Sequence, residues 1–265
     1  MKDTKFPAFD KTKLPDPNGI PFEGIEGAEI PGRKEVAKKI NGFIAEAKRS
    51  KAIEIQLITA AWGEGKTDAY GRYIKNHSDL KNDYRFDIST STVVNNIGNL
   101  LRGTTNPMAS INFLSSLFSA LSANLKSANN PDSKLFEQTN SSDLLKSVND
   151  SLTNLFDGNK KECYIFLDEF EEILVHPPEI QTQILSGIKE LVNKKCPPVC
   201  DPNNFGGRLH LIIACTPEVW NRIKDNPHLG QIFGGLNSKL PPIDLPVLST
   251  LDSFHLLTDL THITY

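Results

Sequence analysis

The chain has 265 residues, of which 38% are hydrophobic and 23% charged, and this is the composition of an ordinary globular protein. A net charge of −3 excludes a globally basic surface of the kind that binds nucleic acid. Neither an apolar stretch of about 18 residues nor a signal-peptide core is found, so we expect a cytoplasmic protein with no membrane partner.

Residues 1–31 contain five prolines and several glycines, which predicts an irregular N-terminal arm. Between residues 33 and 50 the pattern changes, and apolar residues recur at helical spacing. They are Val36, Ile40, Phe43, Ile44 and Ala47, with charged residues at most other positions. This periodicity predicts an amphipathic helix.

The most informative segment is residues 53–68, where an apolar run leads into a loop ending in Gly65-Lys66-Thr67. The run predicts a strand, and residues 66–76 predict the helix that follows. Backbone N–H groups of such a loop wrap phosphates, a lysine neutralises their oxygens, and a threonine hydroxyl ligates Mg²⁺. The pattern GxxxxGK[ST] is matched except at Ala60, which replaces its first glycine. The predicted nucleotide-binding residues are Ala61, Trp62, Gly63, Glu64, Gly65, Lys66, Thr67 and Asp68.

Three side chains of this loop allow further expectations. Trp62 is expected to pack against a neighbouring helix, and the alternatives are a cover over the nucleotide or a contact with a partner subunit. A carboxylate beside phosphates is unfavourable, so Glu64 is expected to point to solvent and has no chemical role assigned. Asp68 is expected to interact with the N-terminal dipole of the helix.

Residues 84–157, which follow this loop and its helix, have the least distinctive sequence. Polar and apolar residues alternate over residues 84–90, which predicts a second strand. Residues 92–157 are rich in Ser, Asn and Leu and are predicted to form a helical insertion. Within it, residues 112–125 have helical apolar spacing and a small-residue opposite face. This helix either packs on the sheet or offers a surface to a partner. Residues 141–156 predict another helix.

A second motif lies at residues 163–169, where five apolar or aromatic residues run into Asp168 and Glu169. Such a run fits a strand buried on both faces of a parallel sheet, and ligands bind at the carboxyl ends of such strands. Asp168 is predicted to hold Mg²⁺ through water, and Glu169 to polarise an attacking water. The alternative is a helix N-cap followed by a first-turn carboxylate. Glu171 and Glu172 are expected on a solvated helix face.

The last elements complete an alternation of strands and helices. We predict a helix at 179–194, a buried strand at 209–215 that ends before Thr216, a helix at 218–226 and a short strand at 243–245. This order predicts a three-layer αβα sandwich around a mainly parallel five-stranded sheet.

The cysteines fall into two groups. Cys163 and Cys215 lie in apolar runs and are expected to be small buried hydrophobes. Cys196 and Cys200 form CPPVC in a predicted loop, where a local disulfide or, with two further ligands, a metal site are the alternatives.

Together these motifs resemble the AAA+ branch of P-loop ATPases, most similarly the archaeal and eukaryotic origin-recognition initiators and related archaeal and antiviral-defence ATPases. The resemblance covers about residue 30 to the C-terminus. It implies that residues 30–35 contact adenine, which makes Arg33 a nucleotide-binding candidate. It also implies that Thr216 ends the sensor-1 strand and orients the attacking water and the γ-phosphate. Residues 32–248 would be the ATPase core.

Three features depart from the family pattern. Ala60 replaces the first glycine of the loop, and Lys239 stands where many relatives place a trans-acting arginine, for which Arg222 is an alternative. The chain stops at Tyr265, where the family's helical lid would begin. The lid is therefore expected to be truncated or missing, with residues 249–265 as its start or a C-terminal tail.

The resemblance implies ATP and Mg²⁺ as cofactors, with Glu169, Lys66 and Thr216 as catalytic residues and Thr67 and Asp168 as metal ligands. Slow hydrolysis would require a homo-oligomer or a partner subunit that supplies an arginine finger. DNA is a partner by family analogy. The alternative function is a nucleotide-gated module that recruits DNA or a protein with little turnover. The sequence leaves open the process served, whether replication, plasmid maintenance, defence or signalling, and the oligomer size.

Overall fold

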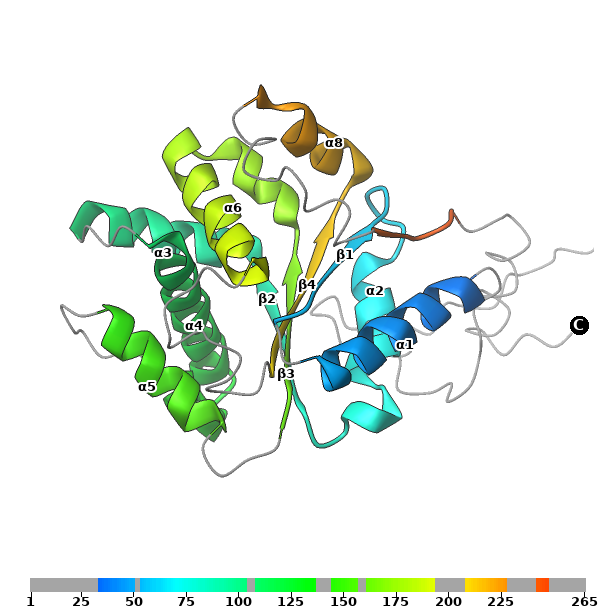
Figure 1. Cartoon of the computed structure of the whole chain (residues 1–265), viewed down its shortest axis with the longest axis horizontal. Helices are drawn as coiled ribbons and strands as arrows, with labels where there is room; N and C mark the ends of the chain where they lie inside the picture. The colour runs from blue at the N-terminus through cyan, green and yellow to red at the C-terminus, as the bar shows by residue number, and fades with distance from the viewer. Residues whose placement is uncertain are drawn as a thin grey trace, which may run out of the picture.

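A parallel sheet of five strands, in the order β2-β3-β4-β1-β5, forms the centre of the computed structural model (Figure 1). The strands are β1 Ile55–Thr59, β2 Tyr84–Ser89, β3 Cys163–Asp168, β4 Leu209–Cys215 and β5 Ile243–Asp244. The structure describes residues 33–50, 53–103, 108–136, 144–156, 161–193, 208–227 and 242–247. Because all strand pairs are parallel, the segments that follow β1, β3 and β4 meet at one edge.

The neighbouring strands β3 and β4, both in the interior of the sheet, are buried along almost their whole length. Ile165 of β3 pairs with Leu211 of β4, and Leu57 of β1 pairs with Ile213 of β4. Strands covered on both faces require apolar side chains at successive positions rather than alternation. This explains why the apolar runs in the sequence coincide with the observed strands.

Helices cover both faces of the sheet and confirm the expected three-layer αβα sandwich (Figure 1). One face carries α1 Lys34–Arg49, α2 Lys66–Tyr70 and its π-helical continuation η2 Gly71–Lys75. The other carries α3 Thr90–Gly103, α4 Ala109–Ser127, α5 Leu144–Phe156 and α6 Pro178–Val192. Shorter elements are η3 Ser78–Leu80, η4 Pro131–Phe136, η5 Phe170–Val175 and the helix α8 Pro217–Asp225.

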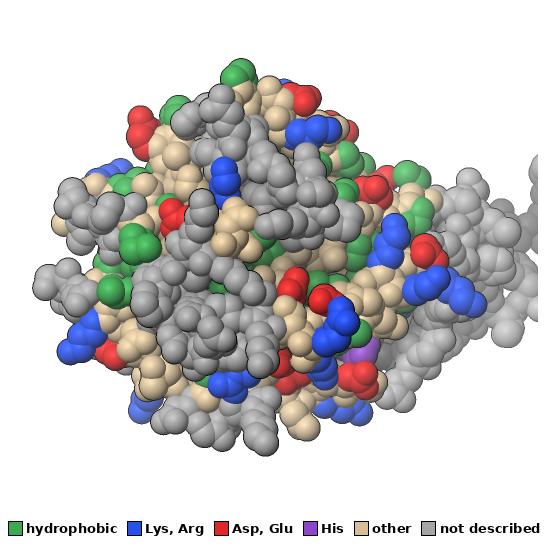
Figure 2. Space-filling model, viewed as in Figure 1, with side chains coloured by type: hydrophobic (Ala, Val, Ile, Leu, Met, Phe, Trp, Pro, Cys, Tyr) green, Lys and Arg blue, Asp and Glu red, His purple; other side chains and the backbone are tan. Residues whose placement is uncertain are grey.

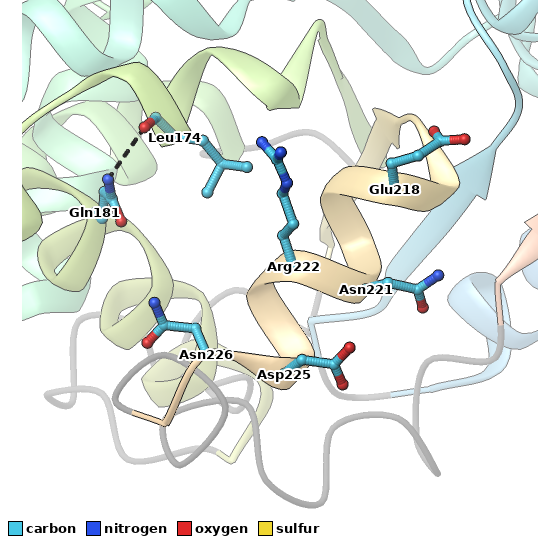
Figure 3. A pocket seen from close by; sticks show the side chains of 7 residues that line it. All are labelled: Leu174, Gln181, Glu218, Asn221, Arg222, Asp225 and Asn226. Carbon is cyan, nitrogen blue, oxygen red and sulfur yellow. Dashed lines mark hydrogen bonds between the residues drawn. The ribbon is translucent and has the colours of Figure 1, made fainter.

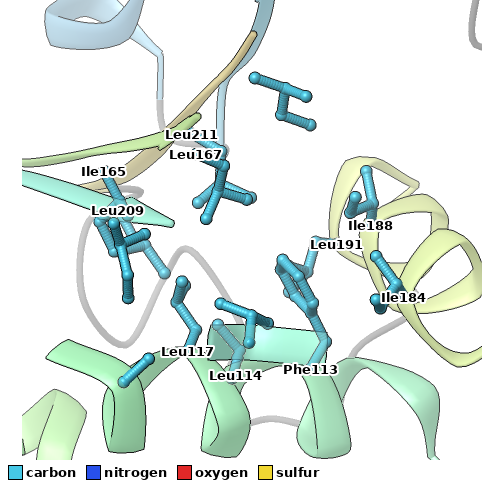
Figure 4. Packing of buried hydrophobic residues seen from close by; sticks show 14 of the residues in the cluster. Phe113, Leu114, Leu117, Ile165, Leu167, Ile184, Ile188, Leu191, Leu209 and Leu211 are labelled. Atoms are coloured by element: carbon cyan, nitrogen blue, oxygen red, sulfur yellow. The ribbon is translucent and has the colours of Figure 1, made fainter. Parts of the chain in front are cut away.

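Helix α4 packs more deeply than its sequence suggested. Its apolar residues Phe113, Leu114 and Leu117 face strands β3 and β4 and helix α6 (Figure 4). Its serines at 110, 115, 116 and 122 are buried as well, because α3, α5, α6 and η4 surround the helix. The packing interpretation of this helix is therefore correct. The partner-surface alternative is wrong for these buried positions.

Several expectations fall outside the described residues. They concern the N-terminal arm, Cys196 and Cys200, Lys239, and the C-terminal segment 249–265. Within the described ranges, no helix has the length and apolar character required to span a membrane.

The contact between α4 and α6 yields a prediction for Gly187. A Cβ at this position would lie 2.7 Å from Phe113 Cβ and 2.8 Å from the Ala109 carbonyl oxygen. Gly187→Ala should therefore lower the free energy of unfolding by about 1–3 kcal/mol, because two packed helices must separate. Urea unfolding followed by circular dichroism measures this change.

The matched control is Gly42→Ala on the exposed side of α1, where a Cβ would meet nothing within 4 Å. Alanine has the higher helix propensity, so this variant should gain about 0.5–1 kcal/mol. Equal effects of the two substitutions would contradict the described α4–α6 contact.

Candidate functional site

The glycine-bearing loop after β1 has a backbone conformation that only glycine adopts easily. Gly63 and Gly65 have φ values of 80° and 83°. Helix α2 begins directly after Gly65, so the loop ends at a helix N-terminus. The Lys66 side chain is only 8% exposed, and its Nζ donates to the carbonyl oxygens of Ala60 at 3.1 Å and Ala61 at 3.3 Å. A buried ammonium group is thus held at the entrance of the loop.

A hydrogen bond joins this loop to the acidic end of β3. Thr67 Oγ1 donates to Asp168 Oδ2 at 2.6 Å, although the two residues are 101 positions apart. The other carboxylate oxygen of Asp168 accepts from the Glu169 backbone N–H at 2.9 Å. Thr90, the first residue of α3, donates to the Asp168 carbonyl oxygen at 2.6 Å. Asp168 is therefore fixed by three separate contacts.

Thr67 and Asp168 are the residues that could hold a metal. Their hydroxyl and carboxylate oxygens are hard ligands of the kind Mg²⁺ prefers, and this ion is usually bound by one or two carboxylates together with phosphates and water. No group of three or more His, Cys, Asp and Glu within the described ranges could hold a metal alone. The donor set fits magnesium that arrives with a phosphate ligand.

Glu169 occupies a corner of the chain. Its φ of 54° and ψ of 45° lie in the left-handed region, and the side chain is exposed. Such a conformation is uncommon for a residue other than glycine. Glu169 stands at the N-cap position of η5, but its side chain makes no capping hydrogen bond. The structure therefore does not support the alternative that these carboxylates serve to cap a helix.

Thr216 lies at the same edge, one residue beyond β4. Cys215 pairs with Thr59 of β1, and its carbonyl oxygen accepts from the Ala60 N–H at 3.3 Å. Thr216 is half-buried at the N-cap position of α8, and its hydroxyl has no partner among the described residues. The fold thus brings the end of β4 beside the first residue of the loop.

Two expectations for the loop are wrong. Trp62 is 87% exposed, so it does not pack against a neighbouring helix, and its other interpretations stay predictions. Glu64 does not simply point to solvent. Its Oε2 turns back and accepts from the Ala61 N–H at 2.7 Å, so the carboxylate satisfies an amide three residues earlier in its own loop.

Arg33 lies against the outer side of the loop. It is 4% exposed, and one guanidinium nitrogen donates to the Glu64 carbonyl oxygen at 2.7 Å. The other terminal nitrogen is buried with no partner among the described residues. Burial lowers the pKa of Arg33, and the negative charges of Tyr73, Asp68 and Glu64 partly offset this shift by raising it. Its contact with adenine stays a prediction, and its contact with the loop is a finding.

Asp68 lies in the first turn of α2, as expected for a residue near a helix N-terminus. Its two carboxylate oxygens accept from Nε of Arg72, at 2.8 Å and 2.9 Å. The pair is four residues apart on one helix face, so it supports the short helix locally. The Asp68 side chain therefore binds Arg72 of its own helical segment and not the loop.

Sequence reasoning missed Glu171. Its Oε2 is buried and has no hydrogen-bond partner among the described residues, whereas a solvated face was expected. The missed signal is the period of three in η5, where Phe170 and Ile173 are both buried. With the 3.6-residue period of an α-helix, Glu171 and Glu172 were instead expected on one solvated face.

A cleft of about 740 Å³ lies between α8 and the η5–α6 segment. It is lined by Leu174, Gln181, Glu218, Asn221, Arg222, Asp225 and Asn226 (Figure 3). Arg222 is exposed and extends from α8 toward Leu174. On the face drawn in Figure 2, basic and acidic side chains are interspersed, and the described residues form no continuous basic area there.

The comparisons with known proteins include a likeness to a solved structure. No family model and no curated protein sequence matches the chain. Its fold is shared with the ORC2 protein of Aeropyrum pernix, which was solved in complexes with ADPNP and ADP. The chain resembles an archaeal origin-recognition protein. The TM-score is 0.58 at 14% identity, and the match covers 91% of this chain but only 54% of ORC2. It therefore supports the fold predicted from the loop and acidic motifs.

Next to the site, the Asp87 carboxylate of β2 lines a cleft of about 410 Å³. Asp87 is exposed on β2, but desolvation of its carboxylate in this cleft raises the pKa of Asp87 to about 6. The charge of Asp168 raises this pKa further, while Lys75 and the Ile88 N–H lower it. Ionisation of Asp87 therefore opposes folding. The protonated form contributes stability that is complete below the ordinary pKa of 3.8 and is lost as the pH rises through about 6.

Asp87→Asn should remove this effect. We expect the variant to match the wild type near pH 4 and to be more stable at pH 7, with the difference growing between the two pKa values. Urea unfolding at several pH values measures it. Asp225→Asn, on the exposed surface of α8, is the control. A difference that does not change with pH would contradict the raised pKa.

Proposed function

We propose that this chain is an ATP-binding domain that couples binding and slow hydrolysis of Mg-ATP to assembly or conformational change. The observation that carries the proposal is the hydrogen bond between Thr67 and Asp168. It places a helix N-terminus, a buried lysine and a carboxylate within one small site. That combination suits a triphosphate with a divalent cation.

Each residue of the site would have a separate role. Backbone amides of Gly63–Lys66 would bind the phosphates, and Lys66 would exchange its two carbonyl partners for phosphate oxygens. Thr67 and Asp168 would hold Mg²⁺, which shields the phosphate charge when bound. Glu169 would accept a proton from the attacking water, and Thr216 would orient the γ-phosphate. The protein then contributes positioning and electrostatics rather than covalent chemistry.

The structural neighbour supports the choice of nucleotide. ORC2 was solved with ADPNP and ADP, both adenine nucleotides. Transfer of this ligand to a chain of 14% identity rests on shared fold and on the loop sequence, and is an analogy. The partner predictions have the same status. One is a homo-oligomer or a second subunit that supplies an arginine finger, for which Arg222 is a candidate among the residues that the structure describes. The other is DNA.

A second candidate function is a nucleotide-gated module with little turnover. The exposed, left-handed position of Glu169 favours it, because an attacking water needs a carboxylate that is held in place. Measurement of turnover in the presence and absence of duplex or single-stranded DNA separates the two functions.

Lys66→Ala should weaken ATP binding by about ten- to a hundredfold, because the charge-assisted hydrogen bonds of the ammonium group are lost. Glu169→Gln should retain binding and lose turnover, because an amide does not accept the proton. Equilibrium titration with a fluorescent ATP analogue and steady-state phosphate release measure the two effects. Lys38→Ala, on the exposed face of α1, is the control for Lys66. Unchanged binding and hydrolysis in both variants would contradict the proposed site.

A further inference from the structure

Strand β2 forms one edge of the sheet, and this edge lacks the usual protection. The strand has six residues, Tyr84–Ser89, with no proline and an unbroken register against β3. The opposite edge strand, β5, has only two residues and lies between Pro242 and Pro246. Short strands and prolines prevent a sheet edge from pairing with another chain. They protect the β5 edge and are missing at β2.

Half of the backbone groups of β2 point away from the sheet. The Tyr84 N–H donates at 2.8 Å to the carbonyl oxygen of Glu162, one residue before β3. Because successive residues of a strand direct their N–H and C=O groups to opposite sides, those of Arg85 and Asp87 point outward. The Asn124 side-chain amide confirms this direction, since it donates to the Asp87 carbonyl oxygen at 3.3 Å. Beyond β2 the described residues contain no further strand, so the outward groups have no ladder partner among them.

The cleft of about 410 Å³ runs along this edge and is lined by four of the six residues of β2. One wall is Lys75 of η2, and the other consists of Leu121, Asn124 and Leu125 of α4. Because η2 and α4 lie on opposite faces of the sheet, a cleft lined by both passes around the strand edge. Asn124 is exposed and its bond to Asp87 is long, so an incoming backbone N–H can replace it.

The side chains of β2 alternate between an apolar and a charged set. Tyr84, Phe86 and Ile88 belong to the hydrophobic core under α4 or pack against it. Arg85 and Asp87 lie on the other face, where Arg85 donates to a backbone carbonyl oxygen of η2. Asp87 makes no ion pair within the described ranges. The open edge therefore has one cation and one unpaired anion, two positions apart.

We propose that β2 pairs antiparallel with β2 of a second copy of this chain, so that two sheets join into one. In the two-fold register that sets Phe86 opposite its own copy, Arg85 of each chain lies opposite Asp87 of the other. These residues direct their backbone groups outward, so each pair exchanges two hydrogen bonds across the joint. Their side chains form opposite-charge pairs. Registers shifted by two residues would instead set Arg85 opposite Arg85, or Asp87 opposite Asp87, which is unfavourable.

The apolar side chains are compatible with the same register. Phe86 meets Phe86, and Tyr84 of one chain lies opposite Ile88 of the other, which are favourable cross-strand pairs. Phe86 and Ile88 are already buried in each chain, so pairing gains little further apolar area. We therefore expect a weak dimer, with a dissociation constant on the order of 10 µM. The dimer does not depend on nucleotide binding.

The test is a charge-reversal cycle in the full chain, followed by sedimentation velocity at several concentrations. Arg85→Glu and Asp87→Arg should each weaken dimerisation by about tenfold or more, because both charge pairs become repulsive. The double variant restores opposite charges in the same register, and its dissociation constant should return to within about threefold of the wild type. Lys38→Glu, on the exposed face of α1, changes the net charge as Arg85→Glu does and should have no effect.

Circular dichroism checks that each variant folds, and Asp87→Asn, with an expected loss of about threefold, replaces Asp87→Arg if that variant does not. A wild type that is monomeric at about 300 µM would overturn the inference and leave the edge to a strand of another protein. A dimer of equal strength in all variants would also overturn it, because another surface would then join the chains. Weakening by both single reversals without recovery in the double variant would contradict the register and with it the inference.

Discussion

The pairing of β1, β4 and β3 sets the distances at the candidate site. Thr59 lies beside Cys215, and Ile213 lies beside Leu167, so the three strands end at one level. The loop, Thr216 and Asp168 follow these ends directly. A shift of one residue in either pairing would turn the side chains of a whole strand to the opposite face. The buried apolar runs of β3 and β4 make such a shift very unfavourable, and the hydrophobic core thereby fixes the geometry of the polar residues.

Charges at this edge are already partly compensated within the chain. Lys66 donates to two carbonyl oxygens, Arg33 donates to a third, and Glu64 accepts from a loop amide. A phosphate group would compete with these internal partners. Binding therefore involves exchange of existing hydrogen bonds and not simple addition of new ones. One guanidinium nitrogen of Arg33 and one carboxylate oxygen of Glu171 lie outside this internal compensation, because neither has a partner in the part of the chain that the structure describes.

Much of the fold follows from local patterns. The strands β3 and β4 were predictable because double burial demands continuous apolar runs, and the parallel order then brings Lys66, Thr67 and Asp168 to one edge. Side-chain directions were harder to predict. Glu171 depends on whether η5 has three residues or 3.6 per turn, and Glu64 on a competing bond within its own loop. The buried serines of α4 depend on four neighbouring elements, which no local periodicity reveals.

The central claim is that the loop after β1 binds the phosphates of a nucleotide. Amide hydrogen exchange of the full chain, with and without Mg²⁺ and a non-hydrolysable ATP analogue, tests it most directly. The account predicts strong protection of residues 62–68, with weaker protection where β3 meets η5, because their amides or side chains contact the ligand. Unchanged exchange in residues 62–68 at saturating nucleotide would contradict the account.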